Sequence, residues 1–175
     1  MAHKGNRAPK QLLVYSPSVL TRTVKVDMQQ VGKNINEILL MKLRTQYEGK
    51  CSAEGYIKPN SIEIYEISSG LVSANSVSFD IIFQCQVCLP VEGMEIMCSV
   101  LNITKAGIRC ESTEKPNSPL IVFIARDHHY SSDEFANVKE SHIIRVKVIG
   151  HRFELNDTHI SIIGELVSRP PPPPP

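Results

Sequence analysis

Two things are scarce in this 175-residue sequence: excess charge of either sign and long apolar runs. The formal net charge is only +1, so no large electrostatic field draws the chain to nucleic acid or to an anionic membrane, and any contact with RNA has to be local. The longest apolar run, Leu120 to Ala125, is far shorter than the roughly 20 residues of a membrane-spanning helix. We therefore expect a soluble protein.

The usual signatures of catalysis are missing as well. No Ser or Cys lies in a Gly-x-Ser-x-Gly elbow or another activating context, and there is no Gly-rich phosphate-binding loop. The basic N-terminus is not followed by an apolar segment, so it is not a secretory signal, and we expect the five cysteines to stay reduced. The sequence predicts a binding or architectural protein that is not an enzyme and needs no cofactor.

Two short motifs raise the alternative of a metal site. Cys85 and Cys88 form a CxxC pair, but they fall in a predicted strand, where residues three apart face opposite sides. Zinc binding needs a turn between such a pair. Asp127, His128 and His129 match the DHH signature of metal-dependent phosphoesterases, yet the further aspartate motifs that hold two metals are absent. We expect no bound metal. Elemental analysis that finds none would exclude the phosphoesterase alternative.

The first half of the chain combines strand patterns with one helical pattern. Apolar residues recur at helical spacing at Ile35, Ile38, Leu39 and Leu43. Asn34 is the expected N-cap, Glu37 completes a capping box, and Gly49 ends the helix. Strands are predicted at 12–15, 19–26, 62–65 and 77–89. Ser16-Pro17 separates the first two, and every odd position of the last one is apolar.

The second half has the pattern of a small barrel. Strands are predicted at 94–100, 108–111, 120–124, 144–148 and 160–166. Gly150 is expected to close the fourth strand. Residues 125–141 read as a long crossing with one helical turn, anchored by Tyr130, Phe135 and Val138. Five strands with a long crossing between the third and the fourth are typical of an OB barrel.

An OB barrel predicts where nucleic acid would lie. The expected surface is the second and third strands, bordered by the loops at 102–106 and 154–159. Rings and guanidinium planes stack on bases, and cations pair with phosphates. The candidate RNA-binding residues are therefore Lys105, Arg109, Phe123, Arg126, His128, His129 and Tyr130. Phe123 lies in the most apolar strand, so it is either a stacking residue or part of the core.

A set of short segments in fixed order runs through nearly the whole chain. They are MKL at 41–43, YEGKC at 47–51, GYI at 55–57, LPVEGM at 89–94, TKAGI at 104–108, FIAR at 123–126, IRVKVIGHR at 144–152 and IGEL at 163–166. In order and spacing the span from Leu12 to Val167 resembles the stalk subunit of DNA-dependent RNA polymerases, a family that includes the seventh subunit of RNA polymerase II and the archaeal E-subunit. EGYIKPNSIEI and NITKAGIR look closer to versions from large nucleocytoplasmic DNA viruses.

The resemblance implies an α+β protein with two domains. A helix packed on a curved antiparallel sheet forms an N-terminal tip domain, and a five-stranded OB barrel that binds RNA follows it. We expect a disordered basic N-terminus at 1–10, the tip domain at 11–91, the OB-fold domain at 92–168 and a polyproline tail at 169–175. The tail either docks in an aromatic groove of a partner or is an inert, solvated end.

The resemblance also implies a function in transcription. In that family a non-catalytic subunit docks on the polymerase core near the clamp, pairs with a smaller fourth-subunit partner and meets nascent single-stranded RNA. Carried over to this chain, the core-docking residues are Glu48, Gly49, Lys50, Cys51 and Gly55. The implied location is the nucleus, or a cytoplasmic virus factory or virion if the protein is viral, with no membrane partner.

One alternative function stays open. A free-standing RNA-binding OB module of an RNA decay or translation machine would have the same barrel, and the isolated chain would bind RNA with an affinity that falls as salt rises. If the chain is a stalk, Pro90 to Gly93 is the joint between its two parts. A flexible insertion between Glu92 and Gly93 should then leave both parts folded but impair transcription.

Overall fold

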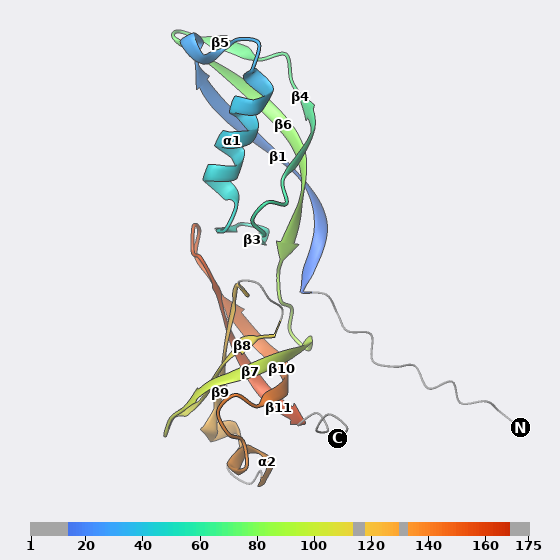
Figure 1. The fold of residues 1–175 in the computed structure, drawn as a ribbon, viewed down its shortest axis with the longest axis vertical. Helices are drawn as coiled ribbons and strands as arrows, with labels where there is room; N and C mark the ends of the chain where they lie inside the picture. The colour runs from blue at the N-terminus through green and yellow to red at the C-terminus, as the bar shows by residue number, and fades with distance from the viewer. Residues whose placement is uncertain (1–13, 114–117, 130–132, 169–175) are drawn as a thin grey trace, which may run out of the picture.

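The computed structural model of the chain describes residues 14–113, 118–129 and 133–168. The molecule is elongated, with a β-sheet and its helix at one end, here called the tip, and a closed barrel at the other (Figure 1). This arrangement confirms the predicted α+β class with a five-stranded barrel in the C-terminal half. The predicted disordered N-terminus, the polyproline tail and Tyr130 lie outside the described residues.

The tip sheet is built around one long strand, β6 (Ser76–Cys88). β1 (Tyr15–Asp27) pairs antiparallel with it along its full length, and β3, β4 and β5 pair in turn with its other edge. The remaining elements of the tip are η1 (Met28–Gln30), α1 (Ile35–Tyr47), β2 (Cys51–Ser52), β3 (Gly55–Ile57), β4 (Glu63–Ile67) and β5 (Leu71–Ser73).

The helix α1 covers one face of this sheet (Figure 1). Its residues Leu39 and Leu43 are fully buried in the same core as Phe83. The predicted end of the helix is confirmed, because Gly49 has a φ of +73°, a conformation that glycine adopts without steric cost. The predicted capping box is wrong: the side chain of Asn34 makes no capping hydrogen bond.

Two strand boundaries in the tip differ from the prediction. β1 runs unbroken through Pro17, where a break was expected. β1 is the edge strand of the sheet, and an edge strand tolerates a residue without an N–H group. The odd-position pattern of β6 is confirmed from Val77 to Val87, whose side chains are buried. It fails at Leu89, which lies past the end of the strand and is 41% exposed.

The barrel closes in the order β10-β11-β9-β8-β7. All its neighbours are antiparallel except β9 and β11, which run parallel. Its strands are β7 (Glu95–Ile103), β8 (Gly107–Ser112), β9 (Leu120–Ala125), β10 (Ile143–Arg152) and β11 (Ile160–Ser168). Alternate residues such as Cys110, Val122 and Ile124 fill the interior and are fully buried.

Between β9 and β10 the chain crosses the end of the barrel, as predicted, with η2 (Arg126–His128) and the short helix α2 (Asp133–Ala136). Phe135 and Val138 anchor the crossing in the core. Gly150 does not close β10, which continues to Arg152; the strand accommodates the residue by a shift of register between Val148 and Gly150.

The cysteines of the CxxC pair lie in different places. Cys85 is buried in the core of the tip, and Cys88 in the cluster that contains the barrel interior. The pair is therefore separated across the strand, as its spacing predicted. In the described ranges there is no group of three or more His, Cys, Asp or Glu that could hold a metal ion. No helix within those ranges is long and apolar enough to cross a membrane.

Candidate nucleic-acid interface

Four side chains line up across the outside of the barrel. Arg109 on β8 lies opposite Phe123 on β9 and also opposite Asn102 on β7. Phe123 in turn is in register with Ile163 on the parallel strand β11. Arg109, Phe123 and Ile163 face away from the interior, because their chain neighbours Ile108, Val122 and Ile162 are buried, and Asn102 is itself exposed. We call Asn102, Arg109, Phe123 and Ile163 the outer ladder.

The outer ladder answers the question that the sequence left open about Phe123. The ring is on the outside, 36% exposed, and not part of the core. It leans across the start of β8, since a Cβ added at Gly107 would lie 2.9 Å from the ring's Cζ and 2.2 Å from the carbonyl oxygen of Ile124. Glycine at 107 therefore leaves space for the ring beside a guanidinium group, a combination that can stack on bases.

The loop between β7 and β8 is held in one conformation by Arg126. The Nε of Arg126 donates to the carbonyl oxygen of Lys105 at 3.0 Å, and Nη2 donates to that of Thr104 at 3.3 Å. The guanidinium carbon also lies 5.3 Å from the centre of the Phe135 ring. Arg126 thus positions the loop that carries the exposed Lys105, in addition to contributing charge to this end of the barrel.

The two histidines of the DHH motif have different environments. His128 is exposed on η2. His129 is only 8% exposed; its Nδ1 is 3.0 Å from the carbonyl oxygen of Ala125, and its Nε2 accepts a hydrogen bond from the backbone N–H of Leu166 at 3.0 Å. Both ring nitrogens of His129 are used inside the barrel, so we assign it a structural role. Tyr130 is not among the described residues.

The positive charge at this surface is local, as expected from the near-neutral sequence. Within the described residues the ion pairs of the barrel join Arg145 to Glu95 and Arg152 to Glu154, so neither Lys105 nor Arg109 is paired with a carboxylate. Unpaired cations beside an exposed ring can meet a phosphate and a base together.

Two members of the outer ladder were missed by the sequence reasoning. Ile163 and Asn102 are separated from Phe123 and Arg109 by many residues, and the strand closure brings them into register. A signal for Ile163 exists in hindsight: it interrupts the alternation of the last strand, with two consecutive isoleucines of which the first is buried and the second 51% exposed.

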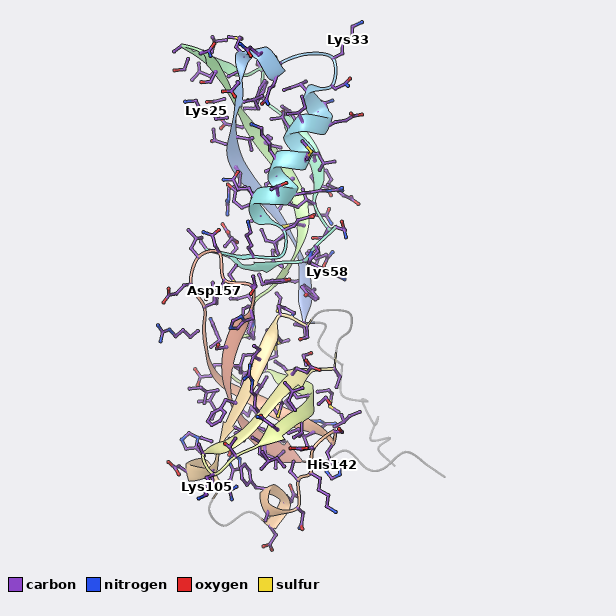
Figure 2. All side chains as sticks on the ribbon, turned by 60° about the vertical axis from the view of Figure 1, so that its left-hand side comes forward. Lys25, Lys33, Lys58, Lys105, His142 and Asp157 are labelled. Carbon is purple, nitrogen blue, oxygen red and sulfur yellow. The ribbon has the colours of Figure 1, made fainter. Side chains whose placement is uncertain are left out.

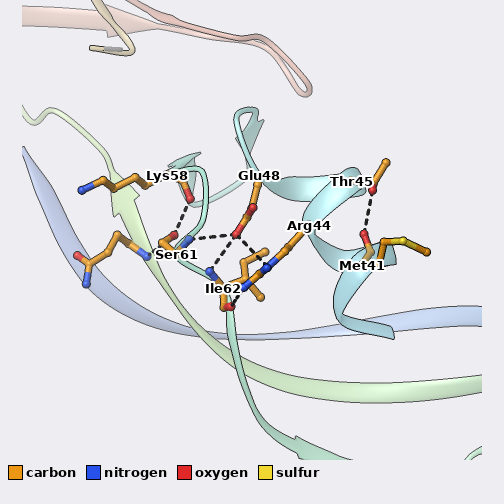
Figure 3. A network of polar contacts seen from close by, with 8 residues as sticks. Met41, Arg44, Thr45, Glu48, Lys58, Ser61 and Ile62 are labelled. Atoms are coloured by element: carbon orange, nitrogen blue, oxygen red, sulfur yellow. Dashed lines mark hydrogen bonds and ion pairs between the residues drawn. The ribbon is translucent and has the colours of Figure 1, made fainter. Parts of the chain in front are cut away.

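The five predicted core-docking residues lie where the tip meets the barrel. Glu48, at the end of α1, has a side chain only 9% exposed. Its Oε1 accepts hydrogen bonds from the backbone N–H groups of Ser61 at 3.1 Å and Ile62 at 3.0 Å, and Arg44 lies 3.9 Å away (Figure 3). Glu48 thereby fixes the 58–62 segment to the end of the helix.

The other four residues also make contacts within the chain. Lys50 donates to the carbonyl oxygen of Thr45 at 3.1 Å, next to the end of α1. Cys51 is 2% exposed, and burial raises the pKa of its thiol to about 11. Gly55 has a φ of +125°, and an added Cβ would lie 2.5 Å from the carbonyl oxygen of Cys88. Docking of these residues, Gly49 included, to another chain stays a prediction.

The far end of the tip carries a different kind of surface. Leu71 and Val72 on β5 are 73% and 64% exposed, and Met28 and Val31 beside them are 38% and 39% exposed. The backbone N–H of Met28 donates to the carbonyl oxygen of Asn75, which holds the two segments together. Exposed apolar side chains, where they form a contiguous patch, are typical of protein-contact sites.

Comparison with known proteins gives relatives of similar length, although no protein-family model matches the chain. A protein of Acanthamoeba polyphaga mimivirus, named as a DNA-directed RNA polymerase subunit, is 26% identical over 176 residues, covering 90% of this chain and 84% of its own. RNA polymerase II subunit RPB7 of Glycine max is 24% identical over 164 residues, covering 85% of this chain and 89% of its own.

Subunit 7 of RNA polymerase II from Arabidopsis thaliana is similar to the same extent, 24% identical over 164 residues. These similarities confirm the resemblance to polymerase stalk subunits that the sequence motifs indicated, and they include a viral relative. The similarity extends over both the tip and the barrel, because each alignment covers most of both chains.

Proposed function

We propose that this chain, a relative of the polymerase stalk subunits, is a non-catalytic stalk subunit of a DNA-directed RNA polymerase. The observation that supports it most is the similarity to RPB7 over 85% of the chain, together with the elongated fold that joins a tip to a closed barrel. It acts in the nucleus, or in a virus factory or virion if the chain is viral. Its function is mechanical: the tip holds the enzyme and the barrel projects from it.

The barrel contacts nascent single-stranded RNA through the outer ladder and the loop that carries Lys105. A base stacks on the half-exposed ring of Phe123, and Arg109 and Lys105 meet the phosphates on either side. His128 lies at the same end of the barrel and is exposed. Because only a few cations take part, binding is weak and guides the transcript without holding it.

The tip docks on the polymerase core through the apolar end formed by Met28, Val31, Leu71 and Val72. This surface is the part of the tip farthest from the barrel (Figure 1). Docking there, in addition to the predicted contacts around Glu48 and Lys50, leaves the barrel projecting into solvent toward the RNA. A fourth-subunit-like partner binds along the side, where Leu89, Val91 and Ile149 are exposed.

Co-purification with a polymerase core tests the docking part of the proposal. We expect the wild-type chain to capture core subunits and the double variant Leu71→Ser with Val72→Ser to lose most of that capture. Val19→Ser, on β1, is the matched control, since Val19 is also exposed, at 59%, but lies away from the apolar end. Absence of core subunits in the wild-type capture would contradict the assignment as a stalk subunit.

RNA binding is tested separately, with a single-stranded oligouridylate of about 12 nucleotides. Phe123→Leu should weaken binding about 5-fold or more, because stacking on one ring contributes roughly 1–3 kcal/mol. Tyr65→Leu is the control for an exposed ring on the tip, 60% exposed. RNA binding that is retained while the core is not captured would favour the free-standing OB module.

A further inference from the structure

The connection between β10 and β11 reaches out of the barrel and meets the tip. Figure 1 shows this hairpin extending along the long axis as far as β3, and Figure 2 places Asp157 beside the end of the tip that carries Lys58. Lys105, on the other loop that borders the predicted RNA surface, lies at the opposite end of the barrel (Figure 2). The two loops therefore have different surroundings.

The contact with the tip is made by the backbone of Cys51. The N–H of Cys51 donates to the carbonyl oxygen of Asp157 at 2.7 Å, and the carbonyl oxygen of Cys51 accepts from the N–H of Asn156 at 2.9 Å. The Sγ of Cys51 also lies 3.7 Å from the carbonyl oxygen of His159. Two backbone hydrogen bonds of opposite direction fix both the distance and the orientation of the loop.

The loop has a defined shape of its own. The backbone N–H of Glu154 donates to Oδ2 of Asp157 at 2.8 Å, and the N–H of Asp157 donates to the carbonyl oxygen of Glu154 at 3.2 Å. Asn156 has a φ of +70°, which Asn tolerates better than most residues. These features preorganise the loop, so little conformational entropy is lost when it meets the tip.

On the tip, the β2–β3 turn that follows Cys51 is also held in place by hydrogen bonds. Glu54 accepts hydrogen bonds from Arg22 at 2.6 Å and from the hydroxyl of Ser52 at 2.9 Å, which ties the β2–β3 turn to β1. The hydrogen bond from Arg22 lowers the pKa of Glu54. The turn also lies against the end of β6, where only glycine fits at Gly55.

Apolar packing continues across the same boundary. Val14, Cys51, Tyr56 and Cys88 come from the tip half of the chain but are buried in the cluster that contains the barrel interior. The covalent joint is held on the barrel too: the N–H of Gly93 donates to the carbonyl oxygen of Val148 at 2.8 Å. Two parts of a chain move relative to each other by default unless such an interface holds them.

We propose that residues 154–159, here called the latch loop, fix the angle between the tip and the barrel and are not an RNA-binding border. On the tip, the latch loop binds to the backbone of Cys51. This assigns Cys51, expected from the resemblance to dock on another chain, a positioning role inside the molecule. The proposal rests on contacts within the chain and stands whether or not the chain belongs to a polymerase.

The test is a distance distribution measured between spin labels at Glu37→Cys on α1 and Ser161→Cys on β11. The five native cysteines are buried, so the labels attach to the two exposed positions. We expect a narrow distribution for the unmodified latch loop and for the control Leu155→Ala, whose side chain is 71% exposed. Replacing residues 154–158 by Gly-Asn-Gly should broaden the distance distribution between the two labels.

Asn156→Pro is the second variant. Proline lacks the N–H that reaches Cys51 and cannot adopt a positive φ, so it breaks the latch without shortening the loop. RNA affinity of both variants should equal that of the unmodified chain, although the distance distribution broadens. A narrow distribution in both variants, or a loss of RNA affinity comparable to that of Phe123→Leu, would overturn the proposal.

Hydrogen exchange of the unmodified protein gives a result that does not depend on how the variants fold. The amides of Cys51 and Asn156 should exchange as slowly as barrel amides of β10, because opening them requires separating the tip from the barrel. Exchange of both amides at the rate of an exposed loop would show that the latch is open in solution and would also overturn the proposal.

Discussion

The imidazole of His129 accepts a backbone hydrogen bond near the end of β11 that a neighbouring strand would otherwise accept. Its Nε2 accepts a hydrogen bond from the backbone N–H of Leu166, two residues past Gly164, where the pairing of β11 with β9 ends. The ring also stacks on Phe135, with centroids 5.1 Å apart. One side chain thus connects the end of β9, the α2 crossing and β11. This contact continues the connection between β9 and β11 past the end of their main-chain ladder, while β11 stays paired with β10 on its other side.

His129→Ala should therefore destabilise the barrel. The half-buried backbone N–H of Leu166 loses its acceptor, and Phe135 loses its stacking partner. We therefore expect the free energy of unfolding to fall by about 2 kcal/mol. Chemical denaturation measures this. The neighbouring variant His128→Ala removes an exposed ring and should change stability by less than about 0.5 kcal/mol. Equal effects of the two variants would contradict the structural role of His129.

Arg109→Ala should change how RNA binding depends on salt. Each phosphate that a cation neutralises contributes to the slope of log affinity against log salt, so losing Arg109 should reduce that slope by about 1. Titration of the oligouridylate at several salt concentrations measures it. Arg145→Ala is the control, because Arg145 lies 3.7 Å from Glu95 and outside the outer ladder. An unchanged slope for Arg109→Ala would argue against a phosphate contact there.

Glu48→Ala should destabilise the tip. The backbone N–H groups of Ser61 and Ile62 share one carboxylate oxygen of Glu48, and they would be left without that acceptor. We expect the free energy of unfolding to fall by about 1.5–3 kcal/mol, the range for hydrogen bonds to a charged group. Glu63→Ala, at an exposed carboxylate on the nearby β4, should be close to neutral. A neutral Glu48→Ala would leave its side chain available for the predicted docking role.

The buried thiols should make the fold sensitive to alkali. Burial raises the pKa of Cys85 from 9.0 to about 11, with the carboxylate of Glu54 as a smaller cause. The unfolded chain loses this proton first, so the stability that the neutral thiol contributes is complete below pH 9 and is lost as the pH rises through about 11. Cys85→Ala should make denaturation midpoints fall less steeply between these pH values, while a pH profile identical to wild type would contradict this.

An insertion in the joint distinguishes two hypotheses: that the joint alone sets the angle between tip and barrel, and that the latch loop sets it. A Gly-Ser-Gly-Ser segment between Glu92 and Gly93 would broaden the label distances if the joint alone set the angle. With the latch loop intact we expect the distribution to stay narrow, and to broaden only when Asn156→Pro is added. The same pair of variants in a transcription assay should show impairment mainly in the combined form, and full impairment by the insertion alone would favour the joint.

Local patterns were sufficient for most of the elements. The alternation of β6 from Val77 to Val87, the helical spacing of Leu39 and Leu43, and the order of the five barrel strands follow from chemistry within a few residues. The predictions that failed concern where strands begin and end, which depends on the strands that pair with them. Among the described residues β1 has no strand partner on its outer edge, so it can pass through Pro17, and β10 passes through Gly150 by a bulge.

The sequence by itself determined the fold class and the order of the five barrel strands, because these depend on periodicity and on the order of motifs. Only the tertiary structure decided that Phe123 faces outward beside Arg109 and Ile163, and that the latch loop binds to the backbone of Cys51. The partners of Phe123 and Cys51 are distant in sequence. Which residues become neighbours depends on strand closure and on contact between tip and barrel, and no local pattern encodes either.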